Sequence, residues 1–563
     1  MNRQQTLSSI KSNPSLDVLI IGGGINGIGT FRDLALNGVN VLLVERADFC
    51  SGASSASSHM AHGGIRYLET GEFRLVREAV GERNRMLQNA AHIVKPLPTA
   101  VPMFKHFSGI FNAPLKFFGI MDKPAERGSL VIKLGLMLYD AFTGAQRAVP
   151  RHKFRGRGAS LKIWEKLNPE IVSTAVYYDG LIQMPERLAL EILLDGEADG
   201  GRALNYVTAL SGSGNHVTLR DELSGDSFDV APRLVVNAAG AWIDATNGAL
   251  SLSTRFIGGT KGSHLVLNHP ELRAAIGENE FFFENDDGRI VLILPLFDKV
   301  LIGTSDIKIE NPDDARCTDE ETEYFLGMVR RVFPNIKIER GQIVFTFTGV
   351  RPLASSGAKS TSQYSRDHEI QVISGVWTGL GYPVHSLVGG KWTSFRAFSE
   401  QAADKALEFL GRARQKSTRE LPVGGGRNFP HGAGEQKKLI DGIVAWTGLP
   451  LARVQSLFER YGTRAEVIAQ FLTQQPDSFL TSLPDYSRRE IDYLVQHEKI
   501  VHLDDFILRR SMLAMLGRLT RPALAELADV LGESLGWDAA QKKAEATRAV
   551  DLLATRHGVV WGD

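Results

Sequence analysis

Cysteine is almost absent from this chain of 563 residues, which contains only Cys50 and Cys317. Two thiols are too few for a disulfide framework or a multi-thiolate metal site, so we expect a protein of a reducing compartment without a metal ion. Net charge is missing too, because 64 Lys and Arg residues balance 64 Asp and Glu residues. This balance argues against a nucleic-acid-binding protein that acts through bulk positive charge.

Long apolar segments are also missing. The first fifteen residues are polar and lack the apolar stretch of a signal peptide, and the longest apolar runs, such as 41–44 and 290–297, have strand length. A bilayer span needs roughly 18–20 apolar residues. We therefore expect a cytoplasmic protein that, if it contacts a membrane, lies on the membrane surface. With 43% hydrophobic and 23% charged residues, the chain has the composition of a globular protein. At roughly 150 residues per domain, its length predicts three or four domain-sized units.

A glycine-rich turn follows the first apolar run. Gly22, Gly24 and Gly27 form the pattern GxGxxG, and Glu45 ends the next apolar run. In a strand–turn–helix–strand unit these glycines allow a tight turn, close approach of a pyrophosphate and close helix packing, and the acid binds ribose hydroxyls. The pattern predicts a dinucleotide-binding domain; the alternative is a glycine-rich turn in an ordinary α/β domain.

Small hydroxyl residues and paired glycines come after the acid. The segments are SGASSASS at 51–58 and HMAHGGIRY at 59–67. Small side chains let the backbone lie against a large flat cofactor, whereas a flexible serine-rich loop is the alternative. In these segments we expect the cofactor contacts to be Ser54, Ser55, Ser58, His62, Gly63 and Gly64.

The chain as a whole resembles the FAD-dependent glycerol-3-phosphate dehydrogenase family, a branch of the D-amino-acid-oxidase-like flavoproteins. The matching segments follow the family's order and are 20–38, 53–79, 235–244, 261–267, 302–306, 347–353, 365–370 and 389–396. The resemblance implies FAD as cofactor, oxidation of sn-glycerol 3-phosphate to dihydroxyacetone phosphate, and a quinone as electron acceptor.

The expected fold is α/β, with a doubly wound FAD-binding domain, an interleaved antiparallel-sheet substrate domain and a helical C-terminal domain. The expected boundaries are 15–95, 201–255 and 371–413 for the FAD-binding domain, 96–200 and 256–370 for the substrate domain, 414–434 for a linker and 435–563 for the helical domain. Helices are expected at 72–91, 391–411, 436–446, 451–461, 488–498, 503–516 and from 521 to the end.

The resemblance also implies the residues that bind the polyol phosphate. Arginine suits this role because its guanidinium binds phosphate oxygens in pairs and stays charged. The implied substrate-binding residues are Arg66, Arg351, Arg366, Lys391 and Thr393. The expected catalytic residues are Arg351, Lys391, His62 and His264, in which either histidine is a candidate base and a core histidine is the alternative for each.

A second group of cofactor contacts lies later in the chain. Gly389 and Gly390 are expected to open a helix whose N-terminal dipole, with Lys391, stabilises negative charge on the reduced cofactor; a plain glycine-capped helix is the alternative. The further contacts expected are Ala239, Gly240, Trp242, Gly389, Gly390, Lys391, Trp392 and Thr393.

Three features depart from the family pattern. The family usually carries Lys at His59, a smaller aliphatic residue at Trp392 and a bulkier aliphatic pair at 60–61. Because they flank the expected pocket, another polyol phosphate such as an erythritol phosphate remains an alternative substrate. An oxygen-using glycerol-3-phosphate oxidase is a further alternative. A flavin-binding regulator without turnover is the alternative outside the enzymes, and the retained Arg351 and Arg366 argue against it.

The segment 104–142 is the expected membrane contact, because aromatic side chains insert at headgroup depth and basic ones bind anionic lipid. A core-packed helix pair is the alternative. We expect peripheral attachment to the inner face of the cytoplasmic membrane, no nucleic-acid partner, and an oligomeric state for which a homodimer is one option. The aromatic and basic residues concerned are Phe104, Phe107, Phe111, Phe117, Phe118, Lys105, Lys116, Lys123, Arg127 and Lys133.

Overall fold

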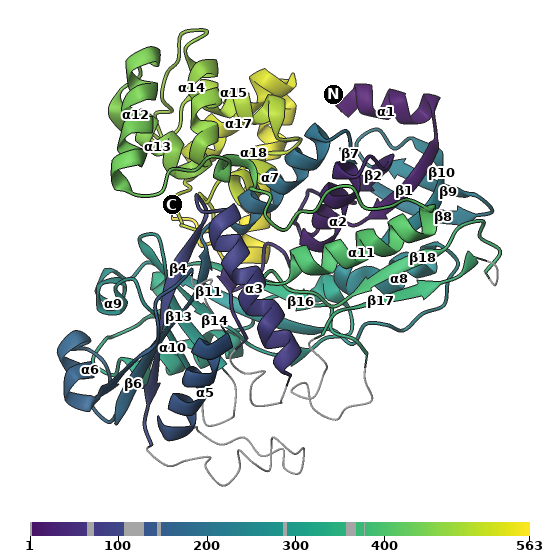
Figure 1. Ribbon diagram of the computed structural model, residues 1–563. Coiled ribbons are helices and arrows are strands. Elements are labelled where there is room, and N and C mark those ends of the chain that lie inside the picture. Colours follow the sequence, from purple (N-terminus) through teal and green to yellow (C-terminus); the bar gives the residue numbers. More distant parts are fainter. Residues whose placement is uncertain are drawn as a thin grey trace.

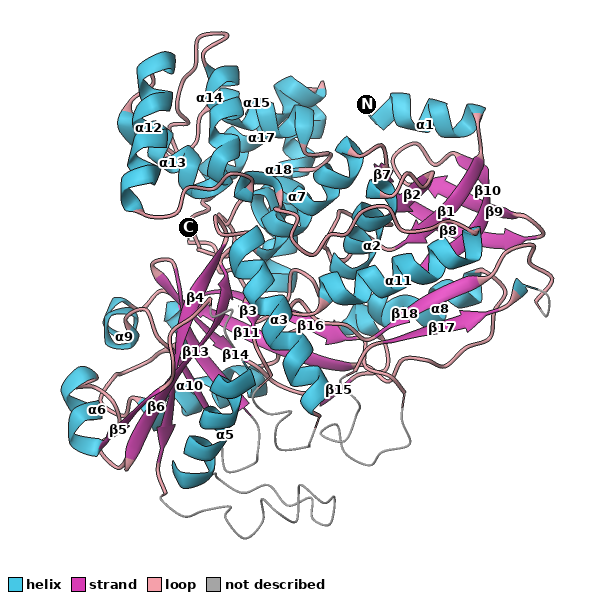
Figure 2. Cartoon of the chain, in the orientation of Figure 1, coloured by secondary structure: helices cyan, strands magenta, loops and turns pink. Residues whose placement is uncertain are grey.

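The computed structural model describes residues 3–64, 72–105, 129–142, 148–284, 290–355, 367–375 and 378–562 (Figure 1). Two β-sheets lie side by side, and a helical region formed by the end of the chain packs on the second sheet described below (Figures 1 and 2).

The first sheet is mostly parallel and consists of apolar strands. In spatial order its main strands are β17 (Glu369–Ile373), β18 (Val384–Val388), β10 (Ser227–Asn237), β1 (Ser15–Ile21), β2 (Val41–Val44) and β7 (Arg202–Leu204), with β8 (Val207–Ser213) and β9 (His216–Asp221) as an antiparallel extension. Alternate residues of β1 enter different cores: Val18 and Ile20 pack in one, Leu19 and Ile21 in the other. Burial on both faces explains the continuous apolar runs in the sequence.

Helices cover both faces of this sheet. On one face lie α2 (Ile25–Leu36), α7 (Pro185–Ala198) and α11 (Phe395–Leu410), and on the other lie α1 (Arg3–Ser12) and α8 (Ile243–Ala249). The expected start of α11 at 391 is wrong by four residues. Residues 392–394 form a turn instead, and Ser394, the N-cap of α11, has the non-helical backbone angles φ −104° and ψ 9°. This doubly wound arrangement confirms the predicted fold class.

The second sheet is mainly antiparallel. Its main strands, in spatial order, are β15 (Ile307–Lys308), β11 (Thr260–Leu267), β14 (Lys299–Gly303), β13 (Ile290–Leu296), β12 (Glu280–Glu284), β4 (Val94–Met103), β6 (Ser173–Ile182) and β3 (Met60–Ala61), with β16 (Ile343–Arg351) paired to β11 and β5 (Lys153–Gly156) to β6. One face packs on α6 (Arg157–Ile163), α9 (Pro270–Ile276) and α10 (Asp319–Val332). The helices α3 (Phe73–Asn89) and α5 (Ser129–Phe142) lie beside β6.

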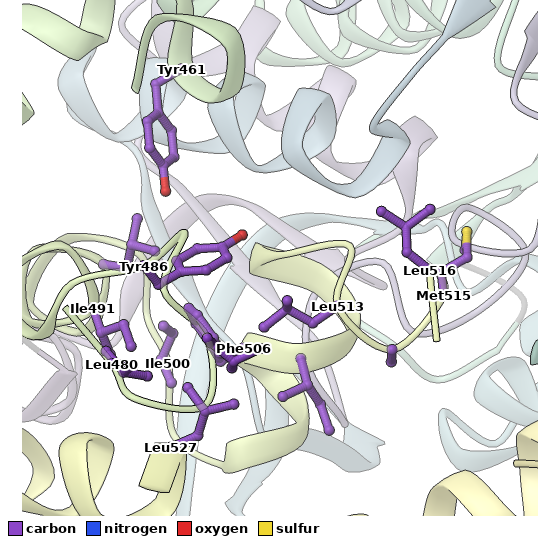
Figure 3. Packing of buried hydrophobic residues seen from close by; sticks show 14 of the residues in the cluster. Tyr461, Leu480, Tyr486, Ile491, Ile500, Phe506, Leu513, Met515, Leu516 and Leu527 are labelled. Carbon is purple, nitrogen blue, oxygen red and sulfur yellow. The ribbon is translucent and has the colours of Figure 1, made fainter. Parts of the chain in front are cut away.

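The helical region shares its core with the second sheet. Figure 3 shows Tyr486, Phe506 and Leu527 packed together in this core, which also contains Phe345 and Phe347 of β16. The helices are α12 (Ala433–Thr447), α13 (Leu451–Tyr461), α14 (Ala465–Leu472), α15 (Arg488–His497), α16 (Leu503–Asp505), α17 (Arg521–Leu535) and α18 (Ala539–His557).

Two helices predicted for this region are wrong in extent. The predicted helix 503–516 ends as an α-helix at Asp505 and continues as a π-helical turn, η9 (Phe506–Arg510). The predicted helix from 521 to the end is broken at Gly536, whose left-handed backbone ends α17.

The segment 414–434, predicted as a linker, packs closely on α2 and on the end of α3. Arg414 binds Asp33 of α2 at 2.6 Å, and the Val423 amide donates to the Asn89 carbonyl at 2.8 Å. These contacts fix the path of the chain into the helical region.

Candidate functional site

A cavity of about 1370 Å³ lies between the two sheets and the helical region. Its walls include the chain after β1 and β10, the cavity-facing side of β11 and β16, and parts of η9 and α18. Pockets for single small ligands usually measure about 300–1000 Å³. The larger volume suits an extended cofactor together with a substrate. The carboxyl ends of adjacent parallel strands are also where doubly wound sheets bind nucleotides.

The glycine turn brings β1 and α2 into close contact. Gly22 has φ +114°, and a Cβ on Gly27 would lie 2.0 Å from the Gly22 carbonyl oxygen. Gly24 is the N-cap of α2 and lines the cavity, as Gly22 does, whereas Gly27 does not. The structure therefore gives Gly27 a packing role and directs the N-terminal end of α2 toward the cavity.

Glu45 lies at the end of β2 on the cavity wall. Its Oε2 accepts from the Gly23 amide at 2.6 Å, and its Oε1 accepts from the Ala47 amide at 3.0 Å. Burial raises the pKa of Glu45, and these two hydrogen bonds oppose the rise. The turn thus holds the carboxylate in one orientation, beside the α2 N-terminus, as ribose binding requires.

The serine-rich segment closes over the start of α2. Ser54 Oγ accepts from the Ile25 amide at 2.9 Å, and the Ser54 carbonyl accepts from Trp392 Nε1 at 2.9 Å. Ser55 and Ser58 line the same cavity. Trp392, one of the departures from the family pattern, is buried and ties the two cofactor-contact segments together.

Trp242 lies at another part of the wall. Its indole N–H donates to Asp313 at 3.0 Å, and the Arg46 guanidinium lies over its ring, 4.5 Å from the centroid. Ala239 and Gly240, which precede Trp242 in the 3₁₀ turn η2 (Gly240–Trp242), also line the cavity. Arg46 and Asp313, like Trp242, line it too.

The return segment 389–393 meets the chain at 62–64. The His62 amide donates to Thr393 Oγ1 at 3.0 Å. His62, Gly64 and each residue from Gly389 to Thr393 line the cavity. Gly63 does not, because its amide donates to Asp179 at 2.8 Å and the Tyr139 hydroxyl fills the place of a Cβ.

Arg351, at the end of β16, presents its guanidinium to the cavity. Nη2 donates to Thr304 Oγ1 and to the Ser305 carbonyl, each at 3.0 Å, and Nη1 lies 3.4 Å from Asp306 Oδ1. A Cβ on Gly262 would lie 2.2 Å from Nη2, so the guanidinium rests directly on the β11 backbone. These contacts hold a permanent positive charge at a fixed place on the wall.

His264 lies on β11 on the same face. Its Nε2 is 2.8 Å from Ser58 Oγ, and its ring stacks on Phe347 with centroids 4.7 Å apart. Burial, together with the nearby Arg351 and His59, lowers the pKa of His264 well below its ordinary value. The imidazole is therefore neutral near pH 7.

Arg66 and Arg366, two of the predicted substrate-binding residues, lie outside the described residues. The structure adds wall residues that sequence reasoning missed. Thr304 and Asp306 belong to the IGTSD segment, which carried a family signal, whereas Arg509 reaches the cavity from the distant η9 without any local signal. In the part of the chain that the structure describes, no group of three or more His, Cys, Asp or Glu side chains is arranged to hold a metal ion.

The wall residues fit FAD. An extended cavity passes the α2 N-terminus and the fixed Glu45 carboxylate, which suit a pyrophosphate and a ribose respectively. Beyond them, Asn26 Oδ1 is buried and has no hydrogen-bond partner within the described ranges, although Asn26 Nδ2 donates to the Gly389 carbonyl. An unpaired acceptor on the wall is expected where a ligand donates.

Comparison with known proteins agrees with this fit. A family model described as FAD dependent oxidoreductase matches residues 17–396. Another, described as the C-terminal domain of alpha-glycerophosphate oxidase, matches residues 416–542. The chain therefore belongs to the FAD dependent oxidoreductase family, and the sequence-based predictions of an enzyme with FAD as cofactor are confirmed.

Relatives that match almost the whole chain narrow the family assignment. Glycerol-3-phosphate dehydrogenase of Synechocystis sp. is 32% identical over 93% of this chain and 94% of its own length. The protein of that name from Pseudomonas aeruginosa is 30% identical over 89% and 92%. A solved glycerol-3-phosphate dehydrogenase from Bacillus halodurans, complexed with FAD, has a TM-score of 0.76 at 22% identity and covers 98% of this chain and 97% of its own. The predicted membership of the glycerol-3-phosphate dehydrogenase family is confirmed.

Proposed function

We propose that this enzyme oxidises sn-glycerol 3-phosphate to dihydroxyacetone phosphate and passes the electrons from FAD to a quinone. The observation that carries the proposal is the Arg351 guanidinium, which Thr304, Ser305 and Asp306 hold on the wall of the cavity that also contains the nucleotide turn. A planar cation suits a phosphate group. The names of the relatives support the same substrate.

In the proposed reaction, Arg351 binds the phosphate, and Lys391 and Thr393 lie on the same cavity wall to position the polyol. FAD, when bound, supplies the acceptor for the hydride that leaves C2. The hydroxyl proton must leave at the same time, and His264 is our candidate for receiving it. Its imidazole is neutral and therefore has a lone pair for the proton, although burial and the nearby Arg351 and His59 lower its pKa and so its basicity. His62 is the second candidate for this role.

Anaerobic mixing with sn-glycerol 3-phosphate tests the substrate. We expect loss of the oxidised flavin absorbance and formation of dihydroxyacetone phosphate in equal amount. Glycerol, which lacks the phosphate, and erythritol 4-phosphate, which is longer, serve as comparisons. Faster reduction by erythritol 4-phosphate would replace the substrate but keep the chemistry. A flavin that no polyol phosphate reduces would contradict the proposal.

The acceptor is tested separately. During turnover in air we expect a soluble quinone analogue to be reduced in proportion to the product, with little hydrogen peroxide. Peroxide formed in proportion to dihydroxyacetone phosphate would instead identify an oxidase.

For localisation, we propose peripheral attachment to the inner face of the cytoplasmic membrane. No helix within the described residues is long and apolar enough to cross a bilayer. Most of the predicted contact segment 104–142, including 106–128, lies outside the described residues. In the helix α5 that ends this segment, Lys133 and Met137 are exposed while Leu136 and Tyr139 are buried. The Arg331 guanidinium lies over the ring of Phe104, 5.5 Å from the ring centroid. Phe104 also packs against the core of the second sheet, which favours a core role for Phe104.

Sedimentation with anionic vesicles at low salt tests this attachment. We expect the protein to pellet with the vesicles and to be released by high salt with detergent. Charge reversal at Lys105, Lys116 and Lys123 should weaken pelleting without lowering dye-linked activity. Wild-type protein that stays in the supernatant would favour a soluble acceptor.

A further inference from the structure

The turn after β2 carries Glu45 and, three residues later, Asp48. Both line the cavity, and Asp48 is only 1% exposed. The backbone of this turn pairs with the segment that follows β7. The Tyr206 amide donates to the Ala47 carbonyl at 2.9 Å, and the Val207 amide donates to the Glu45 carbonyl at 2.8 Å. A displacement of this turn would therefore move the carboxylate expected to bind the ribose.

The helical region holds this turn through two adjacent arginines of η9. Arg510 pairs with both Asp48 oxygens, with Nη2 3.0 Å from Oδ1, and Arg509 Nε lies 2.5 Å from Oδ2. Adjacent side chains of an α-helix point in different directions, about 100° apart. Arg509 and Arg510 are the last two residues of the π-helical turn η9, and both long side chains reach the one carboxylate. Arg510 is buried, and Arg509 also lines the cavity.

A second set of contacts joins the helical region to the segment that follows β7. The Asn205 side-chain amide donates to Asp48 Oδ1 at 3.0 Å and to the Lys499 carbonyl at 2.9 Å. The Tyr206 hydroxyl donates to Asp505 at 2.6 Å. The segment that supports the turn is thus itself attached to the helical region.

We propose that Arg510, together with Arg509, is a positioning residue for the cofactor: through Asp48 the helical region holds the ribose-binding turn, so that FAD affinity depends on the C-terminal part of the chain. A purely structural ion pair would join the two parts of the molecule without affecting the ligand. The distinction lies in the position of Asp48, since this residue shares one short turn with Glu45 and is among the residues that line the cavity.

The charges of Asp48, Arg509 and Arg510 should give a substitution in this group a large effect on FAD affinity. Burial would raise the pKa of Asp48, but the guanidiniums of Arg510 and Arg509 outweigh it and lower the pKa to about 2. Asp48 is therefore ionised throughout the working pH range. Removing Arg510 leaves a buried carboxylate with one cation fewer, which a rigid turn cannot accommodate without shifting.

The experiment measures the dissociation constants of FAD and of ADP for the apoprotein of wild type, Asp48→Asn, Arg510→Met and the double variant. We expect each single variant to weaken FAD binding about tenfold or more, since one partner of a buried charge pair is lost. The double variant should lose less FAD affinity than the product of the two single-variant factors, because both changes disrupt one interaction. ADP, which carries the ribose without the flavin, should lose affinity by the same factor as FAD.

A matched control is the ion pair of Arg453 and Glu490, which are 2.7 Å apart, buried in the helical region and absent from the cavity wall. Arg453→Met should lower the melting temperature of the apoprotein but leave both dissociation constants within about threefold of wild type. If Arg510→Met does not fold, Tyr206→Phe provides the milder disruption, and we expect it to weaken ADP binding measurably. Unchanged FAD and ADP affinities in folded Asp48→Asn protein would overturn the proposal.

Discussion

The cavity wall around the nucleotide turn and the wall formed by β11 and β16 present different chemistry. The first consists largely of backbone atoms and small residues, such as Gly22, Gly24 and Ser54, and the side chain of Glu45 beside them is fixed by two amides. The second presents a guanidinium and an imidazole: Arg351 is held by the segment that follows β14, and His264 contacts Ser58 of the serine-rich segment. Ligand binding at a wall of backbone atoms depends on the close approach of a few atoms. Ligand binding at a wall of side chains depends on their charge and protonation.

This difference separates the consequences of substitution. Added bulk should damage the nucleotide wall most, because the backbone there has no room to move. Loss of charge should damage the β11–β16 wall most and leave the cofactor in place.

Gly24→Val should abolish FAD binding and give colourless, folded protein. The new side chain begins 3.2 Å from Ser54 Oγ and extends where the N-terminus of α2 meets the cavity. The measurement is flavin absorbance per mole of purified protein, with circular dichroism to establish folding. Gly442→Val is the control, because a Cβ at that helical glycine meets nothing within 4 Å. Stoichiometric FAD in the Gly24→Val protein would contradict this placement of the pyrophosphate.

Arg351→Ala should lower catalytic efficiency by about 30-fold to 1000-fold, since loss of a charge-assisted clamp costs about 2–4 kcal/mol. FAD content should stay at the wild-type level. Arg351→Lys should recover little activity, because an ammonium group cannot reproduce the paired donors of the fork. Arg340→Ala, which removes a half-exposed arginine on the surface, is the control and should change nothing. Unchanged efficiency in Arg351→Ala would remove this residue from the site.

The second sheet also contains a buried acid, Glu280. Its ionisation should lower the free energy of unfolding as pH rises. Burial raises the pKa of Glu280 to about 8, and the Thr99 hydrogen bond only partly opposes this. Because the folded value exceeds the unfolded one, the stabilising contribution is full below about pH 4.5 and falls at higher pH by about 1.4 kcal/mol per pH unit until about pH 8.

Glu280→Gln should remove this dependence. Urea unfolding at pH 6 and pH 7 should show wild type losing about 1.4 kcal/mol more than the variant over that interval. Glu278→Gln, at a position that is 81% exposed, should behave as wild type. Parallel pH profiles for wild type and Glu280→Gln would show that Glu280 is ionised in the folded protein.

The two walls also differ in how far the sequence predicts them. The nucleotide wall is local: Gly22, Gly24 and Glu45 lie within one strand–turn–helix–strand unit, and the period and spacing of its residues predict the geometry. For the other wall, the resemblance predicts Arg351 as a substrate-binding residue, and the structure places Arg351 on the cavity wall. It could not show that Thr304 and Asp306 hold the guanidinium, since those contacts depend on strand pairing.

Contacts made by the helical region were beyond prediction for the same reason. Arg509 and Arg510 occur in a run that looks helical, and both pair with Asp48, which is far away in the sequence. Gly63 is predicted to touch the cofactor, and the structure adds that its amide donates to Asp179 and that the Tyr139 hydroxyl fills the place of a Cβ. Motif reasoning places a backbone segment near a ligand, and it cannot decide which residues of the segment neighbouring side chains cover.

The smallest effect should come from a single hydrogen bond on the nucleotide wall. Ser54→Ala removes the acceptor of the Ile25 amide at the start of α2. Loss of a helix-capping acceptor costs about 1 kcal/mol, which corresponds to about a fivefold change in an equilibrium constant. We expect the dissociation constant of FAD to rise by about this factor, measured by titration of the apoprotein. Ser55→Ala is the matched control, because Ser55 lines the same cavity but donates to the Gly52 carbonyl instead. An equal loss in both variants would mean that the serine-rich segment acts through its flexibility, whereas a loss confined to Ser54→Ala assigns the effect to the helix N-terminus.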